Sequence, residues 1–155
     1  MPFRIIGLPA EAFQPLFTLS DEELAARGAI RRIADDRQPG YPCRVSLTDS
    51  KPGDRLILAN YEHHAVASPY RMRYAVYVRK GEERYDAVDR VPEQLRIRTL
   101  AVRAFDAGGM AVAWELTEGR ELEVAIKRLF ADPRAQYIHA HYAAAGCYAA
   151  RIDRA

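Results

Sequence analysis

The sequence predicts an α+β fold, with a mainly antiparallel β-sheet and two or three helices packed at one face or at its margins. Segments with strand patterns follow one another along the chain and do not alternate strictly with helices, which favours antiparallel pairing. Turn residues such as Pro52-Gly53 and Gly108-Gly109 separate pairs of these segments at the short spacing of hairpins.

The first segments read as a short strand over residues 3–8 and a short helical stretch after it. Ser20 and Glu23 form a capping box, because the Ser20 side chain can accept the backbone N–H three residues on while Glu23 reaches back. The helix that begins there should run to about Arg27 and end at Gly28, a residue type favoured just after helix ends.

The middle of the chain, residues 30–79, carries strand patterns. Residues 43–48 and 55–61 flank a Pro-Gly turn, so they read as a hairpin with a short loop. Over residues 71–79 apolar and polar side chains alternate, as expected of a half-buried antiparallel strand. Residues 91–95 read as one turn of helix with a proline at its first position.

A second hairpin is predicted for residues 100–106 and 110–116, on either side of the Gly-Gly turn. The clearest helix covers residues 121–131 and ends at Asp132-Pro133. Its apolar stripe is formed by Leu122, Ile126 and Leu129.

Length and composition are ordinary for a globular protein. The chain has 155 residues, of which 49% are hydrophobic and 28% charged. This balance predicts a single domain over residues 1–155 with its own core. The apolar runs are far shorter than the ~20 residues that cross a bilayer, so we expect no membrane partner. The amino-terminal segment lacks the apolar stretch of a secretory signal, which favours a cytoplasmic protein.

The charges disfavour nucleic acid as a partner. Lys+Arg 23 against Asp+Glu 21 gives a net charge of +2, and acids are interspersed among the bases. Nearly all the bases are Arg, which reflects composition bias or a set of guanidinium groups for carboxylate or phosphate. Nucleotide-binding loops, nucleophile elbows, His-Glu-x-x-His and Cys-x-x-Cys are absent, so the sequence indicates no particular cofactor.

The last segment, residues 137–153, reads as a hairpin whose register decides which side chains meet. A three-residue loop usually closes with Gly in the left-handed region, which fits Ala144-Ala145-Gly146. With that loop Ala143 pairs with Cys147, His141 faces Ala149, and His139 faces Arg151.

Alternation along these two strands gives each face a different character. The apolar face would carry Ile138, Ala140, Tyr142, Tyr148, Ala150 and Ile152. The polar face would carry Tyr137, His139, His141, Cys147, Arg151 and Asp153.

The polar face suggests a site for a small anionic molecule. His139 and Arg151, with Arg44 from a neighbouring strand, would offer donors to a carboxylate or phosphate. If the protein is an enzyme, His141 and Cys147 would be the reactive pair, because cationic neighbours lower the pKa of a thiol and an imidazole can act as its base.

Metal binding is the main alternative, through His139, His141 and Cys147 or with His63, which follows a strand at residue 61. The cation of Arg151 beside His139 argues against it.

A third hypothesis is a non-catalytic interaction domain, in which the polar side chains of the last hairpin lie on the surface and have no role in binding or catalysis. A fourth is redox sensing through Cys43 and Cys147, which requires Cα atoms within ~7 Å. The sequence makes no prediction of oligomeric state.

Several short segments resemble a known family. They are Pro42-Cys43-Arg44-Val45-Ser46-Leu47, Arg103-Ala104-Phe105-Asp106, Leu129-Phe130-Ala131-Asp132-Pro133 and His139-Ala140-His141 with Gly146-Cys147-Tyr148. With these segments the chain resembles the small bacterial family called domain of unknown function 1203. The resemblance implies a stand-alone bacterial domain, and it supplies no catalytic residue because the family has no assigned activity.

Overall fold

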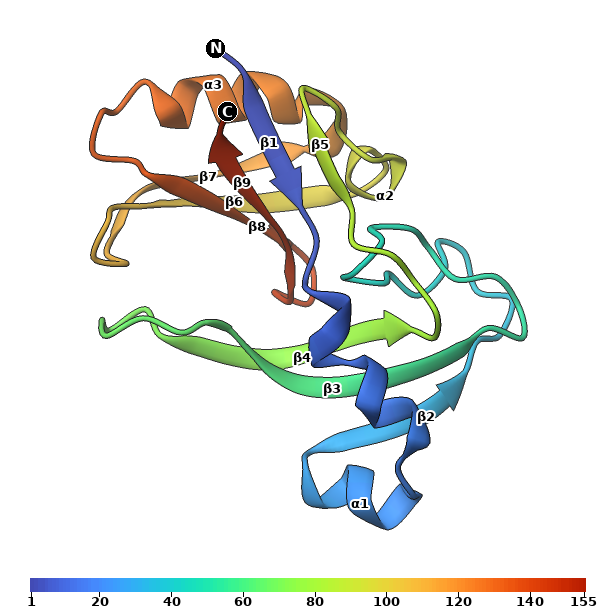
Figure 1. The fold of residues 1–155 in the computed structure, drawn as a ribbon. Coiled ribbons are helices and arrows are strands. Elements are labelled where there is room, and N and C mark those ends of the chain that lie inside the picture. Colours follow the sequence, from blue (N-terminus) through green and yellow to red (C-terminus); the bar gives the residue numbers. More distant parts are fainter.

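A computed structural model describes all residues, 1–155, as two antiparallel sheets with few helices. Six strands pair in the order β5-β1-β9-β8-β6-β7, and three pair in the order β2-β3-β4. The larger sheet lies between helix α3 on one side and the three-stranded sheet on the other (Figure 1). The predicted α+β class with mainly antiparallel strands is confirmed.

The elements have the following bounds. The larger sheet comprises β5 (Asp86–Val88), β1 (Phe3–Ile6), β9 (Tyr148–Arg154), β8 (Tyr137–Tyr142), β6 (Thr99–Phe105) and β7 (Ala111–Glu118). The smaller sheet comprises β2 (Ala29–Ile33), β3 (Arg55–His64) and β4 (Met72–Arg79). The α-helices are α1 (Asp21–Ala26), α2 (Glu93–Arg96) and α3 (Leu122–Phe130), and the 3₁₀ turns are Ala10–Ala12, Gln14–Thr18 and Gly119–Glu121. None of the helices has the length and apolar character needed to cross a bilayer.

Two hydrophobic clusters hold the layers together. The first lies between α3 and the larger sheet, where the predicted stripe of Leu122, Ile126 and Leu129 is buried. The second lies between the two sheets and includes Ile57 and Val76 of the smaller sheet. The larger sheet is therefore covered on both faces, and polar side chains in the middle of its second face, such as His139 and His141, are enclosed.

The predicted capping box at the start of α1 is present. The Ser20 side chain accepts the Glu23 N–H at 3.1 Å, and Glu23 accepts the Ser20 N–H at 3.2 Å. Gly28 follows the helix with a φ of 69°, a conformation that favours glycine.

We expect Ser20→Ala to lower the free energy of unfolding by about 1 kcal/mol, because the Glu23 N–H loses its acceptor. Urea denaturation measures the change. Ser20→Asp keeps an acceptor at the same position and should match the unsubstituted protein. Equal denaturation midpoints for Ser20→Ala and Ser20→Asp would contradict a role for the cap.

The predicted strand over residues 43–48 is wrong. The Cys43 N–H donates to the Thr48 carbonyl at 3.0 Å and the Leu47 N–H donates to the Cys43 carbonyl at 3.1 Å, so the segment closes into a tight turn. Its apolar side chains alternate in sequence and are buried, but they point inward from the turn. Arg44 therefore reaches the protein interior from this turn and not from a strand beside β8.

Candidate functional site

Strand β8 is buried along its whole length because both faces of the larger sheet are covered. His139 and His141 are only 2% and 1% exposed, and their side chains point away from α3 into the space between the sheets. Burying two imidazoles on one strand is costly unless their ring nitrogens find partners.

The β8–β9 hairpin has the predicted outer register and closes at Gly146 as predicted, but its loop has four residues, 143–146, and not three, because the Tyr142 N–H donates to the Cys147 carbonyl at 2.9 Å. Gly146 has a φ of 83°, and His139 faces Arg151. Nearer the turn the register shifts: Ala140 faces Ala150, but His141 faces Tyr148. Ala149 is thus the extra residue of a β-bulge, which places Cys147 and Tyr148, between the bulge and the turn, on the faces opposite to those predicted.

The bulge corrects the predicted faces of two residues. Tyr148 is buried as predicted, but it lies on the face with the histidines, where its ring stacks on His63 with the centroids 4.7 Å apart. Cys147 was expected beside His141, but it packs against the cluster under α3 and borders a cavity with Tyr142. The structure therefore does not bring His141 and Cys147 together as a reactive pair.

His63 joins the cluster from the smaller sheet. Strand β3 continues beyond the predicted end at Tyr61 to His64, with a register irregularity between these two residues. One ligand nitrogen each from His63, His139 and His141 lies within 4.8 Å of the others.

The hydrogen bonds of the four histidines differ. Nδ1 of His141 lies 2.9 Å from the Gly146 carbonyl, so it carries the proton and donates. His64 is bonded at both nitrogens, to the Tyr70 carbonyl at 2.8 Å and to the Tyr137 hydroxyl at 2.6 Å. Both ring nitrogens of His63 and Nδ1 of His139 are buried without any partner.

Burial and the neighbouring imidazoles keep the cluster neutral. Desolvation, with the charges of nearby histidines as smaller causes, lowers the pKa of His63 to about 3. Desolvation lowers the pKa of His141 to about 4, against the effect of the Gly146 hydrogen bond. The pKa of His139 lies well below its ordinary value for the same main reason. Near neutral pH the three rings are uncharged.

A cavity of about 190 Å³ opens beside the cluster. Its lining includes the histidines, Tyr70, Met72 and Arg103, and it contains no carboxylate. Arg103 lies on β6 directly opposite His139 and forms no ion pair; its Nη1 is 3.8 Å from the Met72 sulfur. Burial lowers the pKa of Arg103. An anion in the cavity would offset this partly buried positive charge.

The cluster belongs to a segment that matches a known family. Residues 40–154 match the family described as Protein of unknown function (DUF1203). The chain belongs to this family. No curated protein and no solved structure matches the chain significantly. The resemblance drawn from short sequence segments is therefore confirmed.

The DUF1203 match contains the three clustered histidines, Arg103 and the turn that carries Arg44, whereas β1, α1 and β2 precede it. The histidine cluster and the segments that surround it are thus contained in the family region.

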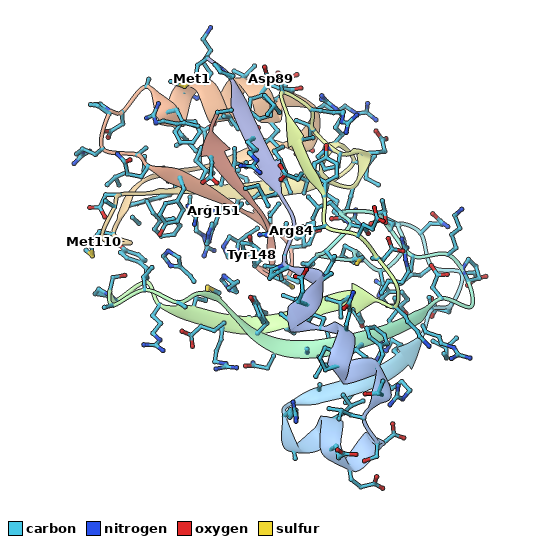
Figure 2. All side chains as sticks on the ribbon, viewed as in Figure 1. Met1, Arg84, Asp89, Met110, Tyr148 and Arg151 are labelled. Carbon is cyan, nitrogen blue, oxygen red and sulfur yellow. The ribbon has the colours of Figure 1, made fainter.

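The other site residues predicted from the sequence border the cluster, but their polar groups are directed to other partners. Arg151 is on the predicted face, but its Nε donates to Asp153 at 2.8 Å and its Cζ lies 4.2 Å from the Tyr137 ring centroid. Figure 2 shows Arg151 and Tyr148 in the space between the sheets. Arg44 borders a second cavity together with Cys147. Cys43 is buried, and both cysteines are free thiols.

Sequence reasoning missed three neighbours of the cluster: His64, Arg103 and Tyr148. A signal for Arg103 was present, because Leu100, Val102 and Ala104 alternate with it on the predicted strand. Pairing that strand with residues 137–142 would have placed Arg103 beside His139. Nothing local in the sequence indicates the partners of His64.

Proposed function

We propose that this protein binds a divalent transition-metal ion through His63, His139 and His141. The proposal is carried by the three buried ring nitrogens, two of His63 and one of His139, that have no hydrogen-bond partner. Buried polar atoms are nearly always hydrogen bonded, so bare nitrogens gathered at one point favour a ligand that takes up their lone pairs. His141 completes the set within 4.8 Å.

The donor set favours a particular class of metal. Imidazole suits zinc, copper, nickel and iron, whereas calcium and magnesium are usually bound through carboxylates, which the cavity lacks. The His141 Nδ1–H donates to the Gly146 carbonyl and leaves Nε2 with a free lone pair. A backbone carbonyl behind a metal-ligating histidine is a common outer-shell contact that fixes the tautomer and the ring orientation.

Metal binding requires a modest closure of the cluster. Ligands at ~2.0–2.1 Å from a tetrahedral ion lie about 3.4 Å apart. The present spacing reaches 4.8 Å, so the rings have to converge. His63 is partly exposed and held by no hydrogen bond, so rotation of its side chain is the least costly way to close the site.

Three protein ligands leave one coordination position open, as in catalytic metal sites. Neutral imidazoles leave the charge of the metal ion uncompensated, and the cavity adds Arg103 but no carboxylate. These charges favour a small anion as the fourth ligand. The anionic ligand expected from the sequence therefore fits this cavity, with Arg103 in the role first assigned to Arg151.

Zinc titration of the metal-free protein tests the proposal. We expect one Zn²⁺ ion per chain by isothermal titration calorimetry and by elemental analysis after desalting. His63→Gln and His141→Gln each remove one ligand and should weaken zinc binding by on the order of 100-fold or more. His64→Gln is the matched control: both nitrogens of His64 already have partners, so the variant should bind zinc as tightly as the unsubstituted protein.

Absence of stoichiometric metal would overturn the proposal, and so would equal affinities for all three variants.

The open position is tested separately with cobalt(II), whose visible spectrum reports on its ligands. Azide should change that spectrum. Arg103→Gln should keep the cobalt ion and weaken azide binding by about 10-fold, the size of one lost charged contact. A cobalt spectrum that azide leaves unchanged would contradict the open position.

A further inference from the structure

Arg44 is a buried cation without an anionic partner. Its side chain is 2% exposed, yet it takes part in no ion pair. Nε donates to the Tyr148 carbonyl and Nη1 to the Pro42 carbonyl, each at 2.8 Å, while Nη2 donates to no acceptor. Arginine is almost never fully buried unless it is paired, so this site lacks one negative group.

The free end of Arg44 borders a cavity of about 530 Å³, a volume typical of small-molecule sites. No carboxylate lines this cavity, and Arg98 and Arg37 add further positive charge. Arg98 is already neutralised by Asp49 at 3.0 Å, and Arg37 is exposed to solvent. One uncompensated positive charge therefore remains in the buried part of the cavity, which suits a monoanion.

The remaining walls are mostly apolar and aromatic. Tyr41, Leu58, Tyr77 and Ala145 line the cavity, and Tyr142 lies beneath the Arg44 guanidinium with its ring centroid 4.9 Å from Cζ. These walls come from the 37–44 loop, the smaller sheet and the β8–β9 turn, which lies between the sheets in Figure 1. They favour a ligand with a flat apolar body attached to its charged end.

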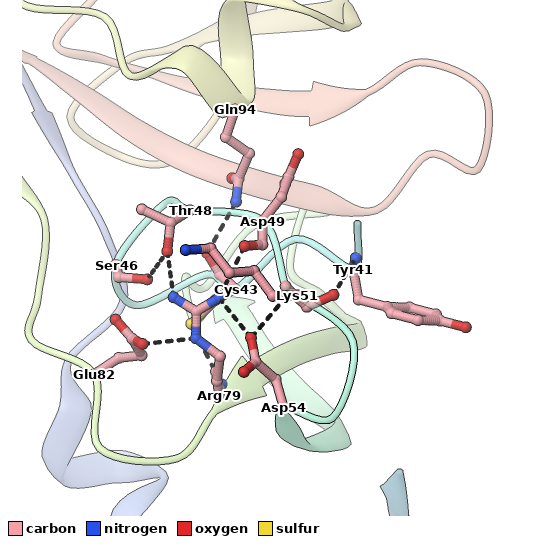
Figure 3. A network of polar contacts seen from close by, with 11 residues as sticks. Tyr41, Cys43, Ser46, Thr48, Asp49, Lys51, Asp54, Arg79, Glu82 and Gln94 are labelled. Carbon is pink, nitrogen blue, oxygen red and sulfur yellow. Dashed lines mark hydrogen bonds and ion pairs between the residues drawn. The ribbon is translucent and has the colours of Figure 1, made fainter. Parts of the chain in front are cut away.

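The turn that carries Arg44 is held rigidly. Arg79 binds the Thr48 hydroxyl at 2.6 Å, the Asp49 carbonyl at 2.9 Å and Glu82 at 2.6 Å, and Figure 3 shows these contacts around the turn. The Arg44 N–H also donates to the Tyr77 carbonyl at 3.0 Å. A guanidinium fixed in advance loses little conformational entropy when a ligand arrives.

We propose that this cavity binds a small organic monocarboxylate, with the carboxylate on Arg44 and the apolar body against the tyrosines. The site is separate from the histidine cluster, needs no metal, and is independent of the function proposed above. It brings together two residues that the sequence singled out, Arg44 as a ligand-binding residue and Cys147 as a reactive one. The Cys147 thiol serves only to report ligand binding, and the proposal gives it no role in a reaction.

Alkylation of Cys147 by iodoacetamide tests the site, because Cys147 is partly exposed on the cavity wall while Cys43 is fully buried. With EDTA present, saturating benzoate should slow the alkylation of Cys147 at least 10-fold. Benzamide, its neutral analogue, should not. Phenyl phosphate carries a second negative charge and should protect less than benzoate.

Arg44→Met should abolish the protection. Because this variant loses two buried hydrogen bonds, a second variant tests the same site without touching Arg44. Ala145→Trp fills the cavity from an exposed turn position and should also abolish the effect of benzoate, whereas Ala107→Trp in the β6–β7 turn is the matched control and should keep it. Protection by benzamide equal to that by benzoate, stronger protection by phenyl phosphate, or full protection in Ala145→Trp would each overturn the proposal.

Discussion

In metal-free protein, lowering the pH from 6.5 to 5 should reduce the free energy of unfolding by about 3 kcal/mol through His139 and His141 alone. Both imidazoles are deeply buried and stay neutral in the fold, since desolvation lowers the pKa of His141 to about 4 and that of His139 well below its ordinary value. In the unfolded chain each has a pKa of about 6.5. His63 acts in the same direction but is partly exposed, so solvent reduces its contribution.

The sign follows from the order of these pKa values. The pKa of each histidine is lower in the folded state than in the unfolded state. Above pH 6.5 the histidine is neutral in both states, so it does not reduce the free energy of unfolding. Below pH 6.5 each histidine binds a proton in the unfolded chain but not in the folded protein. The free energy of unfolding therefore falls by up to about 1.4 kcal/mol for each histidine and each pH unit. For His141 the loss ends near its folded pKa of about 4.

Urea denaturation at a series of pH values, with EDTA present, measures this dependence. His141→Gln removes one of the two deeply buried titrating groups, so its stability should fall by about half as much over the same range. Ser20→Ala removes a helix cap without a titrating side chain and should keep the full pH dependence. If His141→Gln and the unsubstituted protein lose the same stability between pH 6.5 and 5, the buried neutral cluster is excluded.

The elements that could be predicted from the sequence are those that local patterns determine. The capping box at Ser20, the glycine after α1, the Gly-Gly hairpin and the stripe of α3 all depend on residues a few positions apart. The same is true of the outer register of the last hairpin, where His139 faces Arg151 as expected.

The candidate site was predicted only in part because one bulge is invisible in the sequence. Ala149 and Ala150 are both small and apolar, so alternation cannot show which of them is the extra residue. The consequence is large, because a shift of one residue moves each side chain between the bulge and the turn to the other face. Tyr148 thereby joins the histidines, and Cys147 leaves them for the cavity of Arg44.

Two further features depend on contacts between distant segments. His63 meets His139 and His141 only because the smaller sheet packs across the larger one, a relation that no local pattern encodes. The turn at residues 43–48 alternates like a strand because its inward side chains are apolar, although its backbone closes on itself.

Gly7→Ala should be the most damaging single-methyl substitution next to the Arg44 turn, with a loss of at least about 3 kcal/mol in the free energy of unfolding. A Cβ atom at this position would lie 2.1 Å from the Val45 carbonyl oxygen and 3.0 Å from that of Arg44. Both obstacles are backbone atoms, so relief requires one chain to move away from the other. The adjacent Leu8 N–H donates to the Arg44 carbonyl at 2.7 Å, which fixes the two chains at this separation.

The substitution also tests how the segment before residue 40 supports the family region. Gly7 follows β1, outside the matched residues 40–154, whereas the turn it contacts carries Arg44. Gly108→Ala is the matched control, since its Cβ would make only an ordinary contact of 3.5 Å with Asp106, and its stability should stay within about 0.5 kcal/mol. Any Gly7→Ala protein that still folds should show weaker protection of Cys147 by benzoate, because the turn that aims Arg44 has been displaced. Denaturation midpoints that are the same for the two alanine variants would show that this close approach does not hold the turn in place.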